Sequence, residues 1–221
     1  MEHSPDPVPD LGTAPDLAAL AAELRALPAS LGPVRLVAVD GHAGSGKTTF
    51  AGQLAAALGG APVVHLDDLA THQEFFAWTG RLRDRVLTPL AAGRTARFEP
   101  YDWVARRFRG AREIPAAPVV LLEGVGAGRR ALRPELAALL WMELPAADAR
   151  ARGLRRDGPE LADFWAEWTR AEVAHFTADP SRPFAQLTVD GRTSRPLQPH
   201  LAKRSLDREA VEELSSLSLP E

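Results

Sequence analysis

The chain has 221 residues, enough to bury the core of one domain, with two domains as an outside alternative. Its formal net charge is −3 and its pI is about 6.1, which argues against a general attraction to nucleic acid or anionic membranes. Without cysteine there can be no disulfide or thiolate metal site, and no apolar run approaches the roughly 18 residues that span a bilayer, so we expect a cytoplasmic protein.

The first 15 residues are polar and rich in proline, and they lack the basic segment and apolar core of a signal peptide. We therefore expect residues 1–15 to be disordered. Asp16 can cap a helix that extends to about Leu27 and carries Leu20 and Leu24 on one face. This helix is expected to pack beside the first strand.

A glycine-rich loop follows the first predicted strand. The strand covers residues 34–40, and the loop at 41–48 reads Gly-His-Ala-Gly-Ser-Gly-Lys-Thr. The loop matches G-x-x-x-x-G-K-[ST], a pattern whose backbone N–H groups wrap nucleotide phosphates. A helix over residues 48–58 begins directly after it. Only Lys47 and Lys203 among the 26 basic residues are lysines. In a chain with so few lysines, a Gly-Lys-Thr sequence is less expected to arise by chance.

These residues predict a site for ATP and Mg²⁺. Lys47 would reach the β- and γ-phosphates, and the hydroxyl of Thr48 would bind Mg²⁺. The dipole of the following helix adds positive potential at the same point. The residues expected to bind the nucleotide are Gly41, His42, Ala43, Gly44, Ser45, Gly46, Lys47, Thr48 and Thr49.

Two further predicted strands end in acids. Residues 61–66 form a short apolar run before Asp67 and Asp68, and residues 118–124 form another that ends in Glu123. Ligands of open α/β sheets lie beyond the carboxyl ends of the strands, so these acids are placed for chemistry. Asp67 is expected to take a proton from a hydroxyl, and Glu123 to hold Mg²⁺ through water. The alternative is that the acids only form turns or cap helices.

The segment between these two strands is less regular. A helix is expected over residues 82–90, although its proline can end it early, and residues 95–103 are extended and aromatic. Tyr101 and Trp103 could bind a ring or a sugar, or could pack as a surface hairpin. Three arginines follow, either as phosphate contacts or as a solvated face: Arg106, Arg107 and Arg109.

In the last part of the chain, the residue pattern predicts a short helix at 133–138, a strand at 139–144, helices at 148–156 and 159–178, and a strand at 186–191. The helix at 148–156 carries four arginines, which form either a solvated charge run or a lid that brings positive charge to a phosphoryl group. Most of one face of the following helix is expected to be core: Leu161, Phe164, Trp165, Trp168, Glu172 and His175. A further helix is possible at Asp207–Leu217.

In their order, these motifs resemble those of the uridine kinase-like family of P-loop kinases, which includes phosphoribulokinase and bacterial-type pantothenate kinase. The resemblance covers about residues 33–191. Its motifs are Val-Asp-Gly-x-x-Gly-Ser-Gly-Lys-Thr-Thr at 39–49, Leu-Asp-Asp at 66–68, Tyr-Asp-Trp at 101–103, Leu-Leu-Glu-Gly at 121–124, Arg-x-x-Arg-Arg-Asp at 152–157 and Val-Asp-Gly at 189–191. The first is specific for nucleotide binding, and the others are short.

The resemblance implies roles for several of these residues. Asp67 matches the general base of the family and Glu123 the acid near Mg²⁺, while Arg152 and Arg156 match the arginines of the lid. The candidate substrate-binding residues are Asp68, Tyr101, Asp102 and Trp103. The chain departs from the nucleoside-specific members in the residues that follow Asp68 and Trp103. The resemblance therefore extends to the ATP-binding residues but not to the acceptor pocket.

We therefore expect residues 16–192 to form a three-layer α/β/α P-loop kinase domain, with a mainly parallel sheet of about five strands and a helical lid, followed by a tail at 193–221. The expected activity is transfer of the γ-phosphoryl group of ATP to a hydroxyl of a nucleoside-like or other metabolite. Two alternatives stay open: a kinase of the nucleoside monophosphate type, which needs no general base, and a non-catalytic ATP-binding regulatory protein. Neither nucleic acid nor membrane is an expected partner, and a homodimer is possible.

Overall fold

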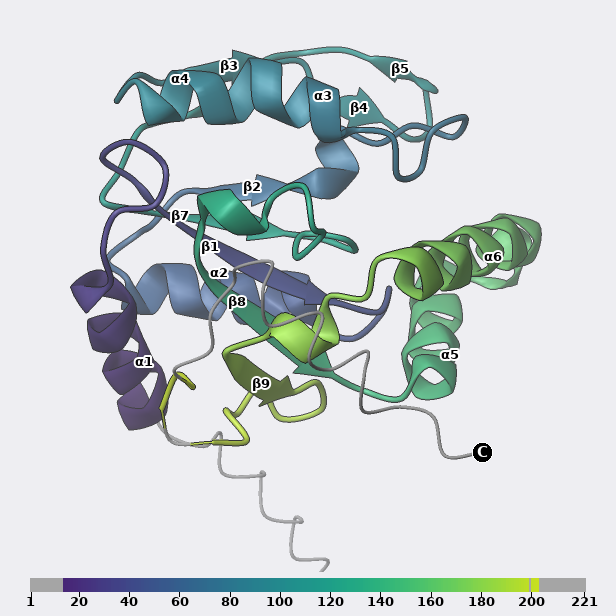
Figure 1. The fold of residues 1–221 in the computed structure, drawn as a ribbon. Coiled ribbons are helices and arrows are strands. Elements are labelled where there is room, and N and C mark those ends of the chain that lie inside the picture. Colours follow the sequence, from purple (N-terminus) through teal and green to yellow (C-terminus); the bar gives the residue numbers. More distant parts are fainter. Residues whose placement is uncertain (1–13, 199, 203–221) are drawn as a thin grey trace, which may run out of the picture.

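A five-stranded parallel sheet forms the centre of the protein (Figure 1). The computed structural model describes residues 14–198 and 200–202. The strand order is β2-β7-β1-β8-β9, and every neighbouring pair is parallel. The strands are β1 Arg35–Gly41, β2 Val63–His65, β7 Val119–Glu123, β8 Leu136–Glu143 and β9 Leu187–Asp190. The predicted parallel sheet of about five strands is thus confirmed.

Apolar side chains fill both faces of this sheet. Along β1, Leu36 and Ala38 belong to one core, whereas Val37 and Val39 belong to the other. Successive residues of a strand face opposite sides, so a strand covered on both faces needs a continuous apolar run. The sequence of β1 meets this requirement, which is why it could be recognised as a buried strand.

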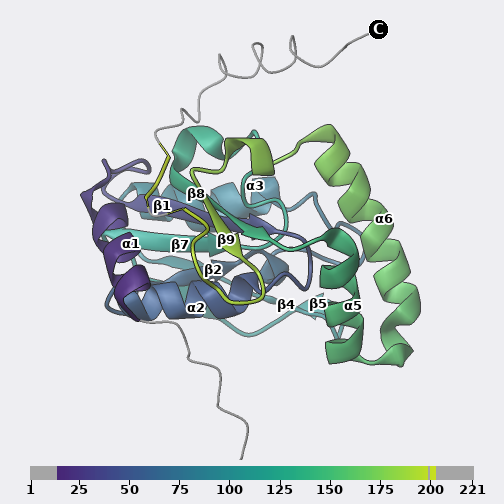
Figure 2. The same cartoon turned by 90° about the horizontal axis from the view of Figure 1, so that it is seen from below.

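Helices cover the two faces and produce the expected three layers. The helices are α1 Ala14–Ala26, α2 Lys47–Ala57, α3 Thr79–Leu82, α4 Thr88–Ala91, α5 Ala146–Asp157 and α6 Ala162–Ala178. α1 and α2 pack on one face, and the segment from α3 to α4 packs on the other. α5 and α6 lie beyond the carboxyl ends of the strands in both views (Figures 1 and 2). They occupy the place expected for the helical lid.

The helix expected at 82–90 is longer than predicted. Helical turns continue from Thr79 to Ala91, with a π-helical turn at Arg83–Leu87 between α3 and α4. Pro89 comes two residues after the end of the π-helical turn, and the helical segment continues past it to Ala91. The proline therefore does not end the helix early.

Two short antiparallel pairs lie outside the main sheet. β3 Ala96–Phe98 pairs with β6 Arg112–Ile114, and β4 Tyr101–Asp102 pairs with β5 Arg107–Phe108. The aromatic stretch after residue 95 therefore forms hairpins, which was one of the two interpretations of its sequence.

The short helix predicted at 133–138 is wrong. Only Arg133–Glu135 form a 3₁₀ turn, and β8 begins at Leu136, three residues before the predicted strand start. Leu36 pairs with Leu136 and Val37 with Ala138 in the ladder between β1 and β8. Pairing with the central strand thus overrides the helix propensity of the alanines.

The predicted disorder at 1–15 falls almost entirely outside the described residues, although α1 already begins at Ala14. The helix predicted at Asp207–Leu217 also lies outside them. Within the described part of the chain, no helix has the length and apolar character needed to cross a membrane.

Candidate active site

The glycine-rich loop joins β1 to the N-terminus of α2. Gly46 directly precedes the helix with a φ of 100°, a left-handed backbone that glycine adopts without strain. Gly44 lies against α5, because a Cβ at Gly44 would be 2.1 Å from the carbonyl oxygen of Ala149. No side chain caps α2, so the first N–H groups of the helix remain open to a ligand at the positive end of the helix dipole. This geometry suits an anion.

A cavity of about 370 Å³ lies in front of this helix terminus. Residues from the loop, from the ends of β2 and β7 and from α5 meet around it. The expected site residues that line it are Ala43, Gly44, Gly46, Lys47, Thr48, Thr49, Asp67, Glu123, Arg152 and Arg156. Gly41, His42 and Ser45 of the same loop do not line it, and Ser45 is fully buried.

Lys47 is buried at the base of the loop. Its Nζ donates hydrogen bonds to the carbonyl oxygens of Gly41 at 3.0 Å and His42 at 2.9 Å. The ammonium group therefore closes the loop on itself. To contact a phosphate, it would exchange these carbonyl oxygens for phosphate oxygens, which are also acceptors.

Glu123 connects the loop helix with the end of β2. Its carboxylate is buried, and Oε1 accepts a hydrogen bond from the Thr48 hydroxyl at 3.2 Å. The same oxygen lies 2.6 Å from Nδ1 of His65. This hydrogen bond raises the pKa of His65, which favours its protonated form. His65 and Glu123 are register partners in the sheet, so adjacent strand ends bring the two side chains together.

The pair of Thr48 and Glu123 fits Mg²⁺ bound together with phosphate. The hydroxyl and the carboxylate are hard oxygen ligands, and both line the cavity in front of the loop. Mg²⁺ usually takes one or two protein oxygens in such sites and completes its octahedron with phosphate and water.

Asp67 follows β2 in the 3₁₀ turn Leu66–Asp68 and borders the same cavity. Asp67 is exposed to the cavity. The pKa of Asp67 is raised, first because the surrounding protein displaces part of the water around the carboxyl and then because the carboxylate of Glu123 repels its charge. A carboxyl with a raised pKa beside a phosphate site is a stronger proton acceptor than an ordinary aspartate.

Both predicted lid arginines come from α5. Nη1 of Arg152 donates to the carbonyl oxygen of Gly191 at 2.8 Å, which ties α5 to the loop after β9. Arg156 makes two hydrogen bonds to the carboxylate of Asp157, at 2.5 and 2.8 Å. Since both arginines also line the cavity, positive charge is available on the side opposite β2.

The four candidate substrate-binding residues do not gather at one place. Asp68 forms an ion pair with Arg112 at 2.9 Å. It does not line the cavity at the glycine-rich loop or the second cavity that adjoins it. Asp102 accepts hydrogen bonds from the backbone N–H groups of Val104 and Ala105 and pairs with Arg109 at 2.6 Å. Both acids are therefore engaged in contacts within the hairpin region.

Tyr101 and Trp103 lie closer to the site. Tyr101 is buried, and its hydroxyl lies 3.0 Å from Nδ1 of His72. Nε1 of Trp103 donates to the backbone carbonyl of Asp67 at 3.1 Å. The hairpin is thus attached to the turn that carries Asp67. The ring of His72 contacts both aromatic rings, with centroids 5.8 Å from Tyr101 and 4.9 Å from Trp103.

A second cavity of about 530 Å³ adjoins the first. The two share Ala43, Asp67, Arg156 and Trp168. The remaining lining residues of the second cavity are His72, Trp103, Val104, Arg106, Asp157, Leu161, Phe164 and Trp165. The helix face predicted as core is therefore only partly core, since Leu161 is 41% exposed and lines this cavity.

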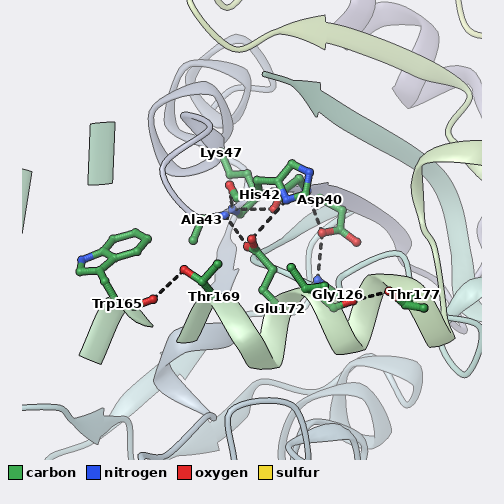
Figure 3. Close-up of polar contacts among 11 residues, drawn as sticks. Asp40, His42, Ala43, Lys47, Gly126, Trp165, Thr169, Glu172 and Thr177 are labelled. Atoms are coloured by element: carbon green, nitrogen blue, oxygen red, sulfur yellow. Dashed lines mark hydrogen bonds and ion pairs between the residues drawn. The ribbon is translucent and has the colours of Figure 1, made fainter. Parts of the chain in front are cut away.

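Glu172 was expected only as one member of a core face, yet it contacts the loop directly (Figure 3). Its carboxylate accepts a hydrogen bond from the backbone N–H of Ala43 at 2.7 Å and lies 3.2 Å from Nδ1 of His42. A glutamate at helical spacing among tryptophans was the available signal, because a buried carboxylate needs a partner.

Asp40 fixes the other side of the loop (Figure 3). It is fully buried and accepts hydrogen bonds from the N–H groups of Gly41, Gly126 and Gly128, at 2.7, 2.9 and 2.9 Å. These bonds join the start of the glycine-rich loop to the segment after β7. His175, expected to be structural, stacks on Phe76 with ring centroids 4.7 Å apart and lines neither cavity.

No model of a protein family matches the chain, and no curated protein sequence matches it. Solved structures that resemble it include a possible uridine kinase from Bacillus stearothermophilus, at 18% identity over 69% of this chain and 90% of that chain, with a TM-score of 0.49. They also include a candidate fructose transport system kinase from Silicibacter sp. TM1040, at 22% identity over 86% of this chain and 97% of that chain, with a TM-score of 0.46. At these identities the likeness concerns the fold and does not extend to a substrate.

Proposed function

We propose that the protein is an ATP-dependent kinase that transfers the γ-phosphoryl group to a hydroxyl of a small molecule. The observation that carries the proposal is the position of Asp67, which borders both the cavity at the glycine-rich loop and the cavity beside it. A base between a phosphate site and an acceptor site is what transfer to a hydroxyl requires.

Binding of the phosphates would use the loop and α5. The N–H groups at the start of α2 and the Lys47 ammonium would hold the β- and γ-phosphates. Mg²⁺, bound by Thr48 and through water by Glu123, would neutralise part of the phosphate charge. Arg152 and Arg156 would add positive charge where negative charge develops during transfer.

The transfer itself would use Asp67. The acceptor hydroxyl gives its proton to the Asp67 carboxylate while its oxygen forms a bond to the γ-phosphorus. The bond between that phosphorus and the bridging oxygen breaks, and ADP leaves with the electron pair. The raised pKa of Asp67 suits this role, because it brings the proton affinity of the base closer to the working pH.

The test is an ATP-consumption screen over hydroxylated metabolites, with Lys47→Ala as the control. A phosphorylated product that depends on Lys47 would support the proposal. If the Lys47→Ala protein phosphorylated the same compound equally well, the assignment of the loop as the ATP site would fail.

Two rival functions give different results. A kinase of the nucleoside monophosphate type transfers to a phosphate, so Asp67→Asn would leave its turnover nearly normal; in a hydroxyl kinase we expect a loss of about 10²–10⁴-fold. A regulatory ATP-binding protein would retain ATP binding and yield no phosphorylated product across the panel.

A further inference from the structure

The second cavity is the place where an acceptor would sit, and its lining restricts the chemistry of that acceptor. Its volume of about 530 Å³ is that of a site for a small molecule. Because Asp67 borders both cavities, a hydroxyl at Asp67 would belong to a molecule whose body fills the second one. The assignment of this cavity to an acceptor rests on the proposed kinase function.

Four aromatic side chains of tryptophan and phenylalanine line this cavity. Trp103 comes from the turn after β4, while Phe164, Trp165 and Trp168 come from α6. The ring centroids of Trp103 and Phe164 are 5.8 Å apart, and those of Phe164 and Trp168 are 6.1 Å apart. The rings thus form a connected aromatic surface from the hairpin to α6.

Two of the indole N–H groups are already used within the protein. Nε1 of Trp103 donates to the carbonyl of Asp67 at 3.1 Å, and Nε1 of Trp165 donates to Asp157 at 3.2 Å. These bonds fix the rings. Trp103 and Phe164 are partly exposed and offer apolar area to a ligand, whereas Trp165 and Trp168 are 4% and 7% exposed and contribute only the parts that line the cavity. A polyol would bury several hydroxyl groups against these rings, at a cost in free energy, whereas a flat ring would bury apolar area and stack.

Arg106 adds one cationic group to the cavity. Arg109 and Arg112 of the same hairpin region pair with Asp102 and Asp68. By contrast, no acidic side chain in the described part of the chain forms an ion pair with Arg106. Arg156, the other cation of the lining, pairs with Asp157 and also borders the cavity at the glycine-rich loop. Arg106 is therefore available to an anionic group of a ligand.

His72 is the remaining polar side chain of the wall. Its removal from water lowers the pKa of His72 and the positive charge of Arg106 lowers it further, which favours the neutral imidazole. The positive charge that a ligand meets at this end of the cavity is thus that of Arg106.

We propose that the phosphoryl acceptor is a hydroxyl-bearing aromatic or heteroaromatic acid. Its ring lies against Trp103, Phe164 and the α6 tryptophans, its carboxylate or phosphate contacts Arg106, and its hydroxyl lies at Asp67. In the reaction this hydroxyl loses its proton to Asp67 and gains the γ-phosphoryl group of ATP, and ADP is released.

The experiment compares matched probes on the full chain saturated with Mg²⁺ and the non-hydrolysable analogue AMP-PNP. The probes are the ortho, meta and para isomers of hydroxymethylbenzoate, the corresponding neutral benzamides, and ribitol. Binding is measured by calorimetry and by tryptophan fluorescence, since Trp103, Trp165 and Trp168 are three of the five tryptophans. We expect the best benzoate to bind about tenfold more tightly than its benzamide, and ribitol to bind more weakly than either.

Two variants separate a contact at Arg106 from a general effect of charge. Arg106→Gln should remove the advantage of the benzoate over the benzamide. Arg107→Gln is the matched control, because Arg107 is the next residue, is also exposed and does not line the cavity; it should preserve the advantage. Equal binding of benzoate and benzamide, equal loss in both variants, tighter binding of ribitol, or no binding of any aryl probe would overturn the proposal.

Transfer of labelled γ-phosphate from ATP to the same probes distinguishes this inference from the proposed function. If ribitol accepted phosphate and the aryl probes did not, the acceptor class would be wrong and the kinase function would stand. If the benzoate bound through Arg106 and no probe accepted phosphate, the site for an aromatic acid would stand and the hydroxyl-kinase function would be contradicted.

Discussion

The carboxylate of Glu172 accepts a hydrogen bond from the backbone N–H of Ala43 at 2.7 Å, so helix α6 holds the glycine-rich loop directly. The second oxygen of the same carboxylate lies 3.2 Å from Nδ1 of His42. The His42 ring is also packed edge-on against Trp141 and Phe176. Helix α6 therefore holds the loop at His42 and Ala43, and the same helix lines the second cavity.

Replacing Glu172 should weaken nucleotide binding. Glu172→Ala leaves the N–H of Ala43 without its acceptor, and the N–H is part-buried, so the cost lies toward the lower end of the about 1–3 kcal/mol of a buried donor. We expect the affinity for Mg²⁺-AMP-PNP, measured by calorimetry, to fall about tenfold, which corresponds to about 1.4 kcal/mol. Glu172→Gln should lose less, because the amide retains an oxygen that can accept from Ala43.

Glu167→Ala is the matched control for this change. Glu167 lies on the same helix and is exposed, so its removal should leave the affinity unchanged. An unchanged affinity in Glu172→Ala, with only the melting temperature lowered, would mean that Glu172 supports the helix packing and not the loop.

The proposed base predicts a particular dependence of activity on pH. Asp67 must be ionised to accept a proton, and its pKa is raised by partial removal from water and by the charge of Glu123. The kcat for a compound that the protein phosphorylates should therefore fall on acidification, at a pH above the ordinary aspartate pKa of about 3.9. A pH profile of kcat measures this, with ADP binding across the same range as the control. An acid limb at or below the ordinary aspartate range would contradict the raised pKa.

Asp67→Asn should make the protein more stable at neutral pH. When a carboxyl has a higher pKa in the folded chain than in the unfolded chain, ionisation costs more in the folded state. Stability is then lost as the pH rises from about 3.9 through the folded pKa, and the loss is complete at higher pH. The amide carries no such penalty, so the melting temperature at pH 7 should rise. Because Asp67 is exposed and water screens its charge, we expect a rise of no more than about 2 °C.

The difference in melting temperature between Asp67→Asn and the unchanged protein should shrink as the pH approaches 4, where both side chains are neutral in the folded state. Differential scanning fluorimetry across that range measures the trend. A variant that is less stable than the parent at pH 7 would show that the Asp67 carboxylate is held by favourable contacts. The expected combination of higher stability and lost activity is typical of a strained active-site group.

Part of the site could be predicted because parallel strands end at one edge. The apolar runs of β1, β2 and β7 marked buried strands, and the glycine-rich loop, Asp67 and Glu123 stand at the ends of these runs in the sequence. Once those runs are recognised as neighbouring parallel strands, their terminal residues must lie close together. For this reason the sequence predicted most of the residues that meet at the cavity in front of the loop.

Contacts between distant segments could not be predicted in this way. Glu172 lies 129 residues after Ala43, and only the packing of α6 beside the loop brings them together. His65 reaches Glu123 through strand register, which the sequence does not state. Asp68 and Asp102 stand beside true lining residues but make turn and ion-pair contacts, because adjacent residues in a turn point in different directions.

The packing between α5 and α6 predicts opposite effects for two glycine substitutions. A Cβ at Gly153 on α5 would be 2.2 Å from the indole of Trp165, whose ring is held by the bond from Nε1 to Asp157. Gly153→Ala should therefore overpack the contact and lower the free energy of unfolding by about 1–3 kcal/mol. At Gly52 on α2 no atom lies within 4 Å of the added Cβ, so Gly52→Ala should stabilise the helix by about 1 kcal/mol. Urea unfolding at constant m value measures both. Stabilisation by both substitutions would show that the Trp165 ring can move aside, and the wall of the second cavity would then be adaptable.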